Sequence, residues 1–117
     1  MRTVLIADDD PITVERIKDS LGPREYSVLS ARNGKEFLKS AKKHKPDIVI
    51  LDLIMPVMDG IEALAELRKT SDVPVVIMSA YGNPDKVEEA RELGIECFLN
   101  KPFDPDVLVD VLDVILL

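Results

Sequence analysis

The chain has 117 residues and a formal net charge of −7, and 46% of its residues are apolar and 32% charged. This length fits a single domain over residues 1–117, and this composition excludes an intrinsically disordered chain. The negative charge disfavours a nucleic-acid surface, which needs clustered Lys and Arg. The N-terminal apolar run is too short for a signal peptide or a membrane span, so we expect a cytoplasmic protein without membrane contact.

Five short apolar runs predict five strands, in chain order Thr3–Ala7, Tyr26–Ala31, Asp47–Leu51, Val73–Met78 and Glu96–Leu99. The first, third and fourth runs are nearly continuous in Val, Ile and Leu, which is typical of parallel strands covered on both faces. The last run contains Cys97, the single cysteine. It can form no internal disulfide, and we interpret it as a small buried residue.

Helix signals follow each strand. Asp10-Pro11 predicts a helix that runs to about Leu21, and four more helices are predicted to open at Asn33-Gly34, Asp59-Gly60, Asn83-Pro84 and Asp104-Pro105. Strands and helices therefore alternate along the whole chain. This order predicts an α/β fold: a flavodoxin-like, doubly wound, five-stranded parallel sheet with strand order 2-1-3-4-5 and five helices.

The last predicted helix is unusually apolar. Its predicted core-facing stripe comprises Val107, Leu108, Val111, Leu112, Ile115 and Leu116, and its polar strip comprises Asp106, Asp110 and Asp113. Val109, Val114 and Leu117 are apolar as well. This helix therefore offers either a wide core-facing side or a dimer or partner surface.

Polar residues follow four of the strands at the point where each strand ends. Asp8 and Asp9 follow the first strand and Asp52 follows the third, and these strands are neighbours in the predicted order. An unpaired carboxylate between two apolar stretches, as at Asp52, lowers the stability of a fold. Its presence there therefore favours a functional role. The three acids suit a hard cation, and Mg²⁺ fits best. Ser79 and Lys101 suit phosphate oxygens, so the set predicts phosphoryl transfer to a carboxylate nucleophile. Asp10, before Pro11, is explained by helix capping alone.

Four segments together closely resemble the receiver domain of bacterial two-component response regulators: VLIADDD, DIVILDLIMPVMDGIEAL, PVVIMSA and FLNKPF. The resemblance extends from Thr3 to the last helix. It implies that Asp52 accepts a phosphoryl group from a phosphohistidine on a sensor histidine kinase or a histidine phosphotransfer protein. It also implies a signalling domain that assists its own phosphorylation and dephosphorylation, not an enzyme.

The resemblance also assigns roles around Asp52. Asp8, Asp9, Asp52 and the backbone carbonyl of Ile54 would hold Mg²⁺ or Mn²⁺. Lys101 and Ser79 would bind the phosphoryl oxygens, and Pro102 typically follows a cis peptide bond in this family. Ser79 and Phe98 would form the conformational switch. Ile54 and Tyr81, both bulky, would tune the phosphoform lifetime.

The output of such a domain is expected on the surface formed by the fourth helix, fifth strand and fifth helix. This surface would contact an output domain, a target protein or a second copy in a homodimer. The sequence ends in the last helix, which fits a stand-alone receiver or part of a longer regulator.

Three other functions compete with this interpretation. A haloacid-dehalogenase-type phosphohydrolase needs D-x-D-x-T after the first strand; Asp8 and Asp10 match, but Ile12 stands in the Thr position. A flavin module would need Ser, Thr and Gly in its phosphate loop, where this chain has three acids. The complete set of acceptor, acids, Lys and Ser disfavours a receiver-like scaffold that is never phosphorylated.

Overall fold

A five-stranded parallel sheet forms the centre of the computed structural model, which describes residues 2–24, 26–80 and 84–117. Its strands lie in the order β2-β1-β3-β4-β5, so the predicted flavodoxin-like topology is confirmed. The strands are β1 (Arg2–Ala7), β2 (Tyr26–Ala31), β3 (Ile48–Asp52), β4 (Val75–Ser79) and β5 (Cys97–Asn100). The last three begin one or two residues later than predicted. For β4 the reason is Pro74, which has no N–H for the ladder.

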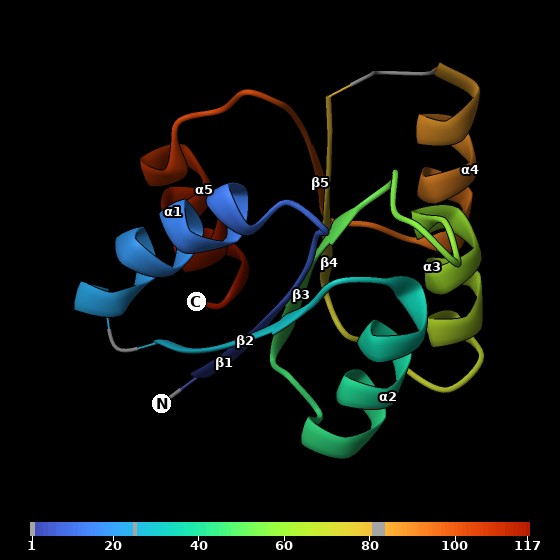
Figure 1. Ribbon diagram of the computed structural model, residues 1–117, viewed down its shortest axis with the longest axis horizontal. Helices are drawn as coiled ribbons and strands as arrows, with labels where there is room; N and C mark the ends of the chain where they lie inside the picture. The colour runs from blue at the N-terminus through green and yellow to red at the C-terminus, as the bar shows by residue number, and fades with distance from the viewer. Residues whose placement is uncertain (1, 25, 81–83) are drawn as a thin grey trace.

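Within the described residues, five α-helices and one short 3₁₀ helix connect and cover the strands. They are α1 (Pro11–Leu21), η1 (Gly22–Arg24), α2 (Gly34–His44), α3 (Gly60–Arg68), α4 (Pro84–Leu93) and α5 (Pro105–Ile115). Helices α1 and α5 lie on one face of the sheet, and α2, α3 and α4 lie on the other (Figure 1). Among the described residues, no helix is both long and apolar enough to cross a bilayer.

Two hydrophobic layers, one on each face, explain the continuous apolar runs of the central strands. Side chains alternate along a strand. In β1, Val4 and Ile6 therefore pack against α1 and α5, and Leu5 and Ala7 pack against the opposite layer. Strands β3 and β4 are buried over their whole length. Such strands hold their terminal residues firmly, which fixes the positions of the polar side chains at their carboxyl ends.

The helix starts follow the predicted capping signals. The side chains of Asp10, Asn33, Asp59 and Asp104 each accept a hydrogen bond from a backbone N–H in the first turn of α1, α2, α3 and α5. These bonds satisfy donors that a helix N-terminus leaves unpaired. The predicted cap of α4, Asn83, lies outside the described residues.

Two packing predictions need correction. In α5, Leu108, Val109 and Leu112 are buried, whereas Val107 is 47% exposed, so the core stripe is rotated relative to the prediction. The rotation has a physical cause: α5 packs on the sheet and beside α1, so its opposite flank stays in solvent. Cys97 is only half-buried, because β5 is the edge strand of the sheet.

Candidate functional site

Three carboxylates converge at the carboxyl ends of β1 and β3. Asp8 follows β1 and is 1% exposed, and Asp52 ends β3 and is 5% exposed. Asp9 is exposed beside them. One carboxylate oxygen from each of these residues lies within 4.8 Å of the other two. The strand order produces this arrangement, because β1 and β3 pair in parallel up to Ala7 and Leu51.

Lys101, just after β5, supplies the positive charge of the site. Its Nζ lies 2.7 Å from Asp8 Oδ2 and 3.1 Å from Asp52 Oδ2. The side chain of Lys101 is 18% exposed, and those of Asp8 and Asp52 are 0% and 7% exposed. The lysine therefore bridges two nearly buried acids. The Lys101–Pro102 bond is cis, as the resemblance implied.

Backbone donors hold the second oxygen of each buried acid. The N–H of Asp10 donates to Asp8 Oδ1 at 2.9 Å, and the N–H of Ile54 donates to Asp52 Oδ1 at 3.0 Å. Each carboxylate thus directs one oxygen to the backbone and the other to Lys101. The sequence interpretation missed the role of the Asp10 N–H, although an Asp that bonds the backbone two residues on is a common turn signal.

The pKa values of Asp52 and Lys101 are both raised, but for different physical reasons. Burial raises the pKa of Asp52, and the nearby Asp8 charge adds to this effect; the Ile54 N–H and Lys101 oppose it only partly. Burial by itself would lower the pKa of Lys101. The hydrogen bond to Asp8 and the Asp52 charge outweigh it, so that pKa is raised. Lys101 is therefore a firmly charged partner for carboxylates that repel one another.

The loop after β3 turns tightly enough to bring α3 against the end of the strand. A Cβ at Gly60 would lie 2.4 Å from the carbonyl oxygen of Asp52 and 2.5 Å from Leu53 Cα, so only glycine fits this approach. The Gly60 N–H donates to the Leu53 carbonyl at 2.8 Å. Met55 is buried and anchors the loop, whereas the Ile54 side chain is 53% exposed.

Two further predicted site residues, Ser79 and Phe98, lie on β4 and β5. Ser79, the last residue of β4, is fully buried, and its carbonyl accepts the Lys101 N–H at 2.8 Å. Phe98 pairs with Ile77 and packs, partly buried, against the layer that includes α2, α3 and α4. Tyr81 lies outside the described residues. Ser79 is thus linked by a backbone hydrogen bond to Lys101, whose side chain contacts Asp8 and Asp52. Phe98 lies three residues before that lysine.

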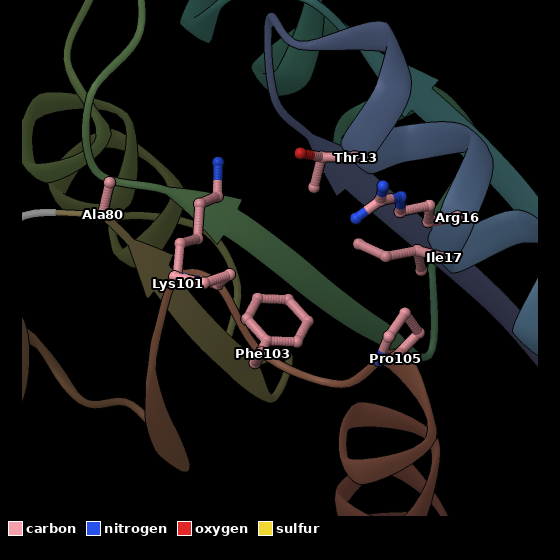
Figure 2. A pocket seen from close by; sticks show the side chains of 8 residues that line it. Thr13, Arg16, Ile17, Ala80, Lys101, Phe103 and Pro105 are labelled. Carbon is pink, nitrogen blue, oxygen red and sulfur yellow. The ribbon is translucent and has the colours of Figure 1, made fainter.

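A cavity of about 290 Å³ opens beside Lys101, between α1 and the segment that joins β5 to α5. Figure 2 shows Arg16 and Ile17 of α1 on one side of this cavity and Phe103 and Lys101 on the other. The lining is mostly apolar, and Arg16 adds a second cation to it besides Lys101. The site therefore has an open flank next to its lysine.

The donor set of the acidic group fits a hard divalent cation. Asp8, Asp9 and Asp52 offer carboxylate oxygens, and neither histidine nor thiol belongs to this group. Mg²⁺ is usually bound by one or two carboxylates with waters and phosphate oxygens. Three carboxylates and one lysine leave a net negative site, which favours a cation.

Comparison with known proteins agrees with this chemistry. The family model of the response regulator receiver domain matches residues 4–113. The transcriptional regulatory protein PdtaR of Mycobacterium tuberculosis is 35% identical over 97% of this chain and 56% of its own length. The transcriptional regulatory protein KdpE of the same organism is 37% identical over 91% of this chain and 47% of its own length. The chain thus spans about half the length of these curated relatives.

Solved structures give the same result for the fold. The chemotaxis protein CheY4 of Vibrio cholerae superposes with a TM-score of 0.90 at 32% identity, covering 97% of this chain and 98% of that chain. The receiver domain of the Francisella response regulator 1452 superposes with a TM-score of 0.89 at 32% identity, covering 97% of this chain and 95% of that chain. Both proteins match almost the whole of the present chain.

Proposed function

The chain belongs to the response regulator receiver family, and we propose that residues 1–117 act as one phosphoacceptor domain that is phosphorylated on Asp52. Receiver domains of response regulators are signalling domains that are phosphorylated by histidine kinases and connect to output domains. The observation that carries the proposal is the pairing of Asp52 with Lys101 at 3.1 Å inside a group of three carboxylates. A nearly buried carboxylate with a lysine and further acids suits phosphoryl transfer better than a structural role.

We propose that Asp8, Asp9, Asp52 and the backbone carbonyl of Ile54 hold Mg²⁺, with Mn²⁺ as a substitute. When bound, the cation supplies charge neutralisation between the carboxylate and the phosphoryl oxygens. Asp9 is exposed and Asp8 is buried, so the first can bind and release ions readily while the second gives the site a fixed position. Lys101 bridges Asp8 and Asp52 and keeps the two acids from repelling one another.

In the proposed step, the Asp52 oxygen that faces Lys101 attacks phosphorus in line. An oxygen–phosphorus bond forms, the phosphorus–nitrogen bond of the donor phosphohistidine breaks, and its electron pair remains on the imidazole nitrogen. The Ile54 N–H holds the other Asp52 oxygen and orients the carboxylate for this attack. Lys101 then pairs with the phosphoryl oxygens.

The proposed switch uses Ser79 and Phe98. The Ser79 hydroxyl would hydrogen-bond the new phosphoryl group, and Phe98 on the neighbouring strand would turn inward with it. Ser79 is fully buried and β4 and β5 are hydrogen-bonded neighbours, which supports coupling between them. The change would be read on the surface of α4, β5 and α5 by an output domain or target protein. The exposed Ile54, beside the acceptor, would slow hydrolysis together with Tyr81.

Exposed apolar side chains around the acids support a protein donor. Ile12 is 64%, Ile54 53% and Val57 72% exposed, and these residues follow β1 and β3 close to the site. A phosphohistidine protein could bury them as it approaches Asp52. We expect Ile12→Asp to slow phosphoryl transfer from such a protein in quenched time-course assays. Phosphorylation of Asp52 by a small acyl phosphate should stay unchanged.

The decisive experiment is intact-mass analysis after incubation with a small acyl phosphate and Mg²⁺. We expect one phosphoryl adduct in the wild type and none in Asp52→Asn, because the amide is a poor nucleophile. Asp72→Asn, an exposed loop position, is the matched control and should label normally. An adduct that persists in Asp52→Asn would overturn the assignment. Steady release of phosphate from a generic ester, lost in Asp8→Asn, would favour a phosphohydrolase instead.

A further inference from the structure

Helix α2 carries a basic surface on an acidic chain. Residues 35–45 contain five lysines and one glutamate, a formal charge of +4 in a chain of −7. All five lysines are exposed: Lys35, Lys39, Lys42, Lys43 and Lys45. Within the described part of the chain none of them forms an ion pair. The helix dipole explains a cation near the end of α2, but it leaves this charge facing water without a partner.

Some of these lysines border an apolar groove between the C-terminal ends of α2 and α3. We define the α2–α3 groove by its lining, which includes Leu38, Ala41, Lys42, Lys45, Leu67 and Val73 and encloses about 500 Å³. Glu66 on the α3 side is already paired with Lys69 at 2.8 Å, so the rim remains positive. Lys42 and Lys45, which line the groove, lie at the C-terminal end of α2, and this end leads into the start of β3, whereas the acidic site lies at the carboxyl ends of β1 and β3 (Figure 1).

A strip on α5 has the opposite character. Val107 is 47% and Val114 is 68% exposed, and Asp106 and Asp110 are exposed between and beside them. At 3.6 residues per turn these four positions fall within about 100° of one another, so they form one surface. We call this surface the α5 strip. It presents apolar side chains flanked by carboxylates, which is the complement of an apolar groove flanked by lysines.

We propose that the α5 strip of one copy docks into the α2–α3 groove of a second copy. The two surfaces cannot meet within one molecule, because α5 and α2 lie on opposite faces of the sheet (Figure 1). Two α5 strips facing each other would bring Asp106 and Asp110 of both copies together and repel. Docking into the groove instead pairs these acids with Lys42 and Lys45 and buries the valines.

This contact is head-to-tail, and it determines how the assembly grows. Each added copy leaves one groove and one strip free, so further copies can add and association can proceed beyond a dimer. Both surfaces are exposed and charged, so the attraction is strongest at low ionic strength and is screened at high salt. The contact needs no phosphoryl group, and it leaves the acidic site open.

Sedimentation equilibrium of the 117-residue chain over a concentration series, without phosphodonor, tests the proposal. At about 0.01 M salt we expect an average mass that rises continuously with concentration, and at about 1 M salt a monomer. Lys42→Glu and Val114→Lys should each be monomeric at low salt. Lys35→Glu makes the same charge change outside the groove and should associate like the wild type.

Mixing the two monomeric variants gives the sharpest result. Lys42→Glu retains its α5 strip and Val114→Lys retains its groove, so an equimolar mixture should form a one-to-one complex that does not grow further. A wild type that is monomeric at every concentration at low salt would overturn the proposal. So would a plateau at the dimer mass that Val114→Lys abolishes and Lys42→Glu does not, or a mixture that stays monomeric.

Discussion

Aspartates occupy two contrasting environments in this molecule. In the acidic pocket, the group of Asp8, Asp9 and Asp52 at the ends of β1 and β3, two of them are nearly buried, whereas at the helix N-termini exposed aspartates cap the first turn. Asp8 and Asp52 are nearly buried and share Lys101. Asp10 and Asp104 are exposed, and each accepts a backbone N–H at 2.9–3.0 Å. Asp8 and Asp10 are only two residues apart in the sequence. Their burial therefore decides which aspartate pairs with Lys101 and which caps α1.

The difference shows where a charge helps the fold and where it costs stability. A capping carboxylate keeps its hydration and satisfies an unpaired helix donor, so it stabilises. A buried carboxylate loses hydration and repels its neighbours, so it depends on a counter-charge. We therefore expect substitutions in the pocket and at the caps to change the free energy of unfolding with different signs and sizes.

The largest effect is expected for Lys101→Met. This change leaves Asp8 and Asp52 without their shared cation and should lower the free energy of unfolding by about 2–3 kcal/mol in chelator, less than for a fully buried pair because Lys101 is 18% exposed. Urea denaturation measures it. Mg²⁺ should restore part of the loss, because the proposed Mg²⁺ site is formed by these acids only in the folded state.

Lys69→Met is the matched control for that measurement. Lys69 pairs with Glu66 at 2.8 Å, but its side chain is 66% exposed, so the loss should stay below about 0.5 kcal/mol. Equal losses in the two variants would show that the pocket pair behaves like any surface pair, and the contrast between the two regions would fail.

The second effect has the opposite sign. Asp52→Asn removes one of two neighbouring buried carboxylates, leaves Asp8 to pair with Lys101 and keeps an oxygen for the Ile54 N–H, so it should raise the free energy of unfolding in chelator by roughly 1 kcal/mol. The pKa of Asp52 is raised because the effect of burial exceeds the opposing effects of the Ile54 N–H and Lys101. The fold therefore disfavours the charged form of Asp52, which agrees with a gain in stability when the charge is removed. Mg²⁺ should stabilise the wild type more than this variant. Destabilisation by Asp52→Asn would contradict the view that the pocket carries a stability cost.

Much of this contrast could be predicted from the sequence, and part of it could not. Apolar runs predicted the strands, the right-handed crossover rule left few topologies, and the common flavodoxin-like order among them is the observed one; it places Asp8 and Asp52 on neighbouring strands. The Asp10-Pro11 signal gave the first cap. The bridge from Lys101 to both acids spans 93 and 49 residues, and no local pattern encodes which oxygen it takes. The burial of Val109 instead of Val107 depends on the angle at which α5 meets the sheet and α1.

A smaller effect is expected at a cap. Asp104→Ala removes the acceptor for the Asp106 N–H, which lies at 2.9 Å, and should lower the free energy of unfolding by about 0.5–1 kcal/mol. Asp104→Asn keeps the acceptor and should stay close to the wild type. Mg²⁺ should leave the difference between the wild type and Asp104→Ala unchanged, because this residue lies outside the acidic group. A difference that changes with Mg²⁺ would show that the Asp104 cap is coupled to the acidic group, which would contradict the separation of the two regions.

The smallest effect is a pH dependence at Asp10. The Thr13 hydroxyl, then the Ile12 N–H, lowers the pKa of Asp10 below its usual 3.8. A carboxyl whose pKa is lower in the folded than in the unfolded state stabilises above the unfolded value, and this contribution disappears as the pH falls through the folded value. Asp10→Ser keeps a capping oxygen but has no such titration. Urea denaturation from about pH 5 downward should therefore show the wild type losing stability faster than Asp10→Ser, with the difference between them constant at higher pH. Parallel acid curves would mean that the Thr13 and Ile12 hydrogen bonds do not lower the pKa of Asp10 on folding, and the proposed pH dependence would fail.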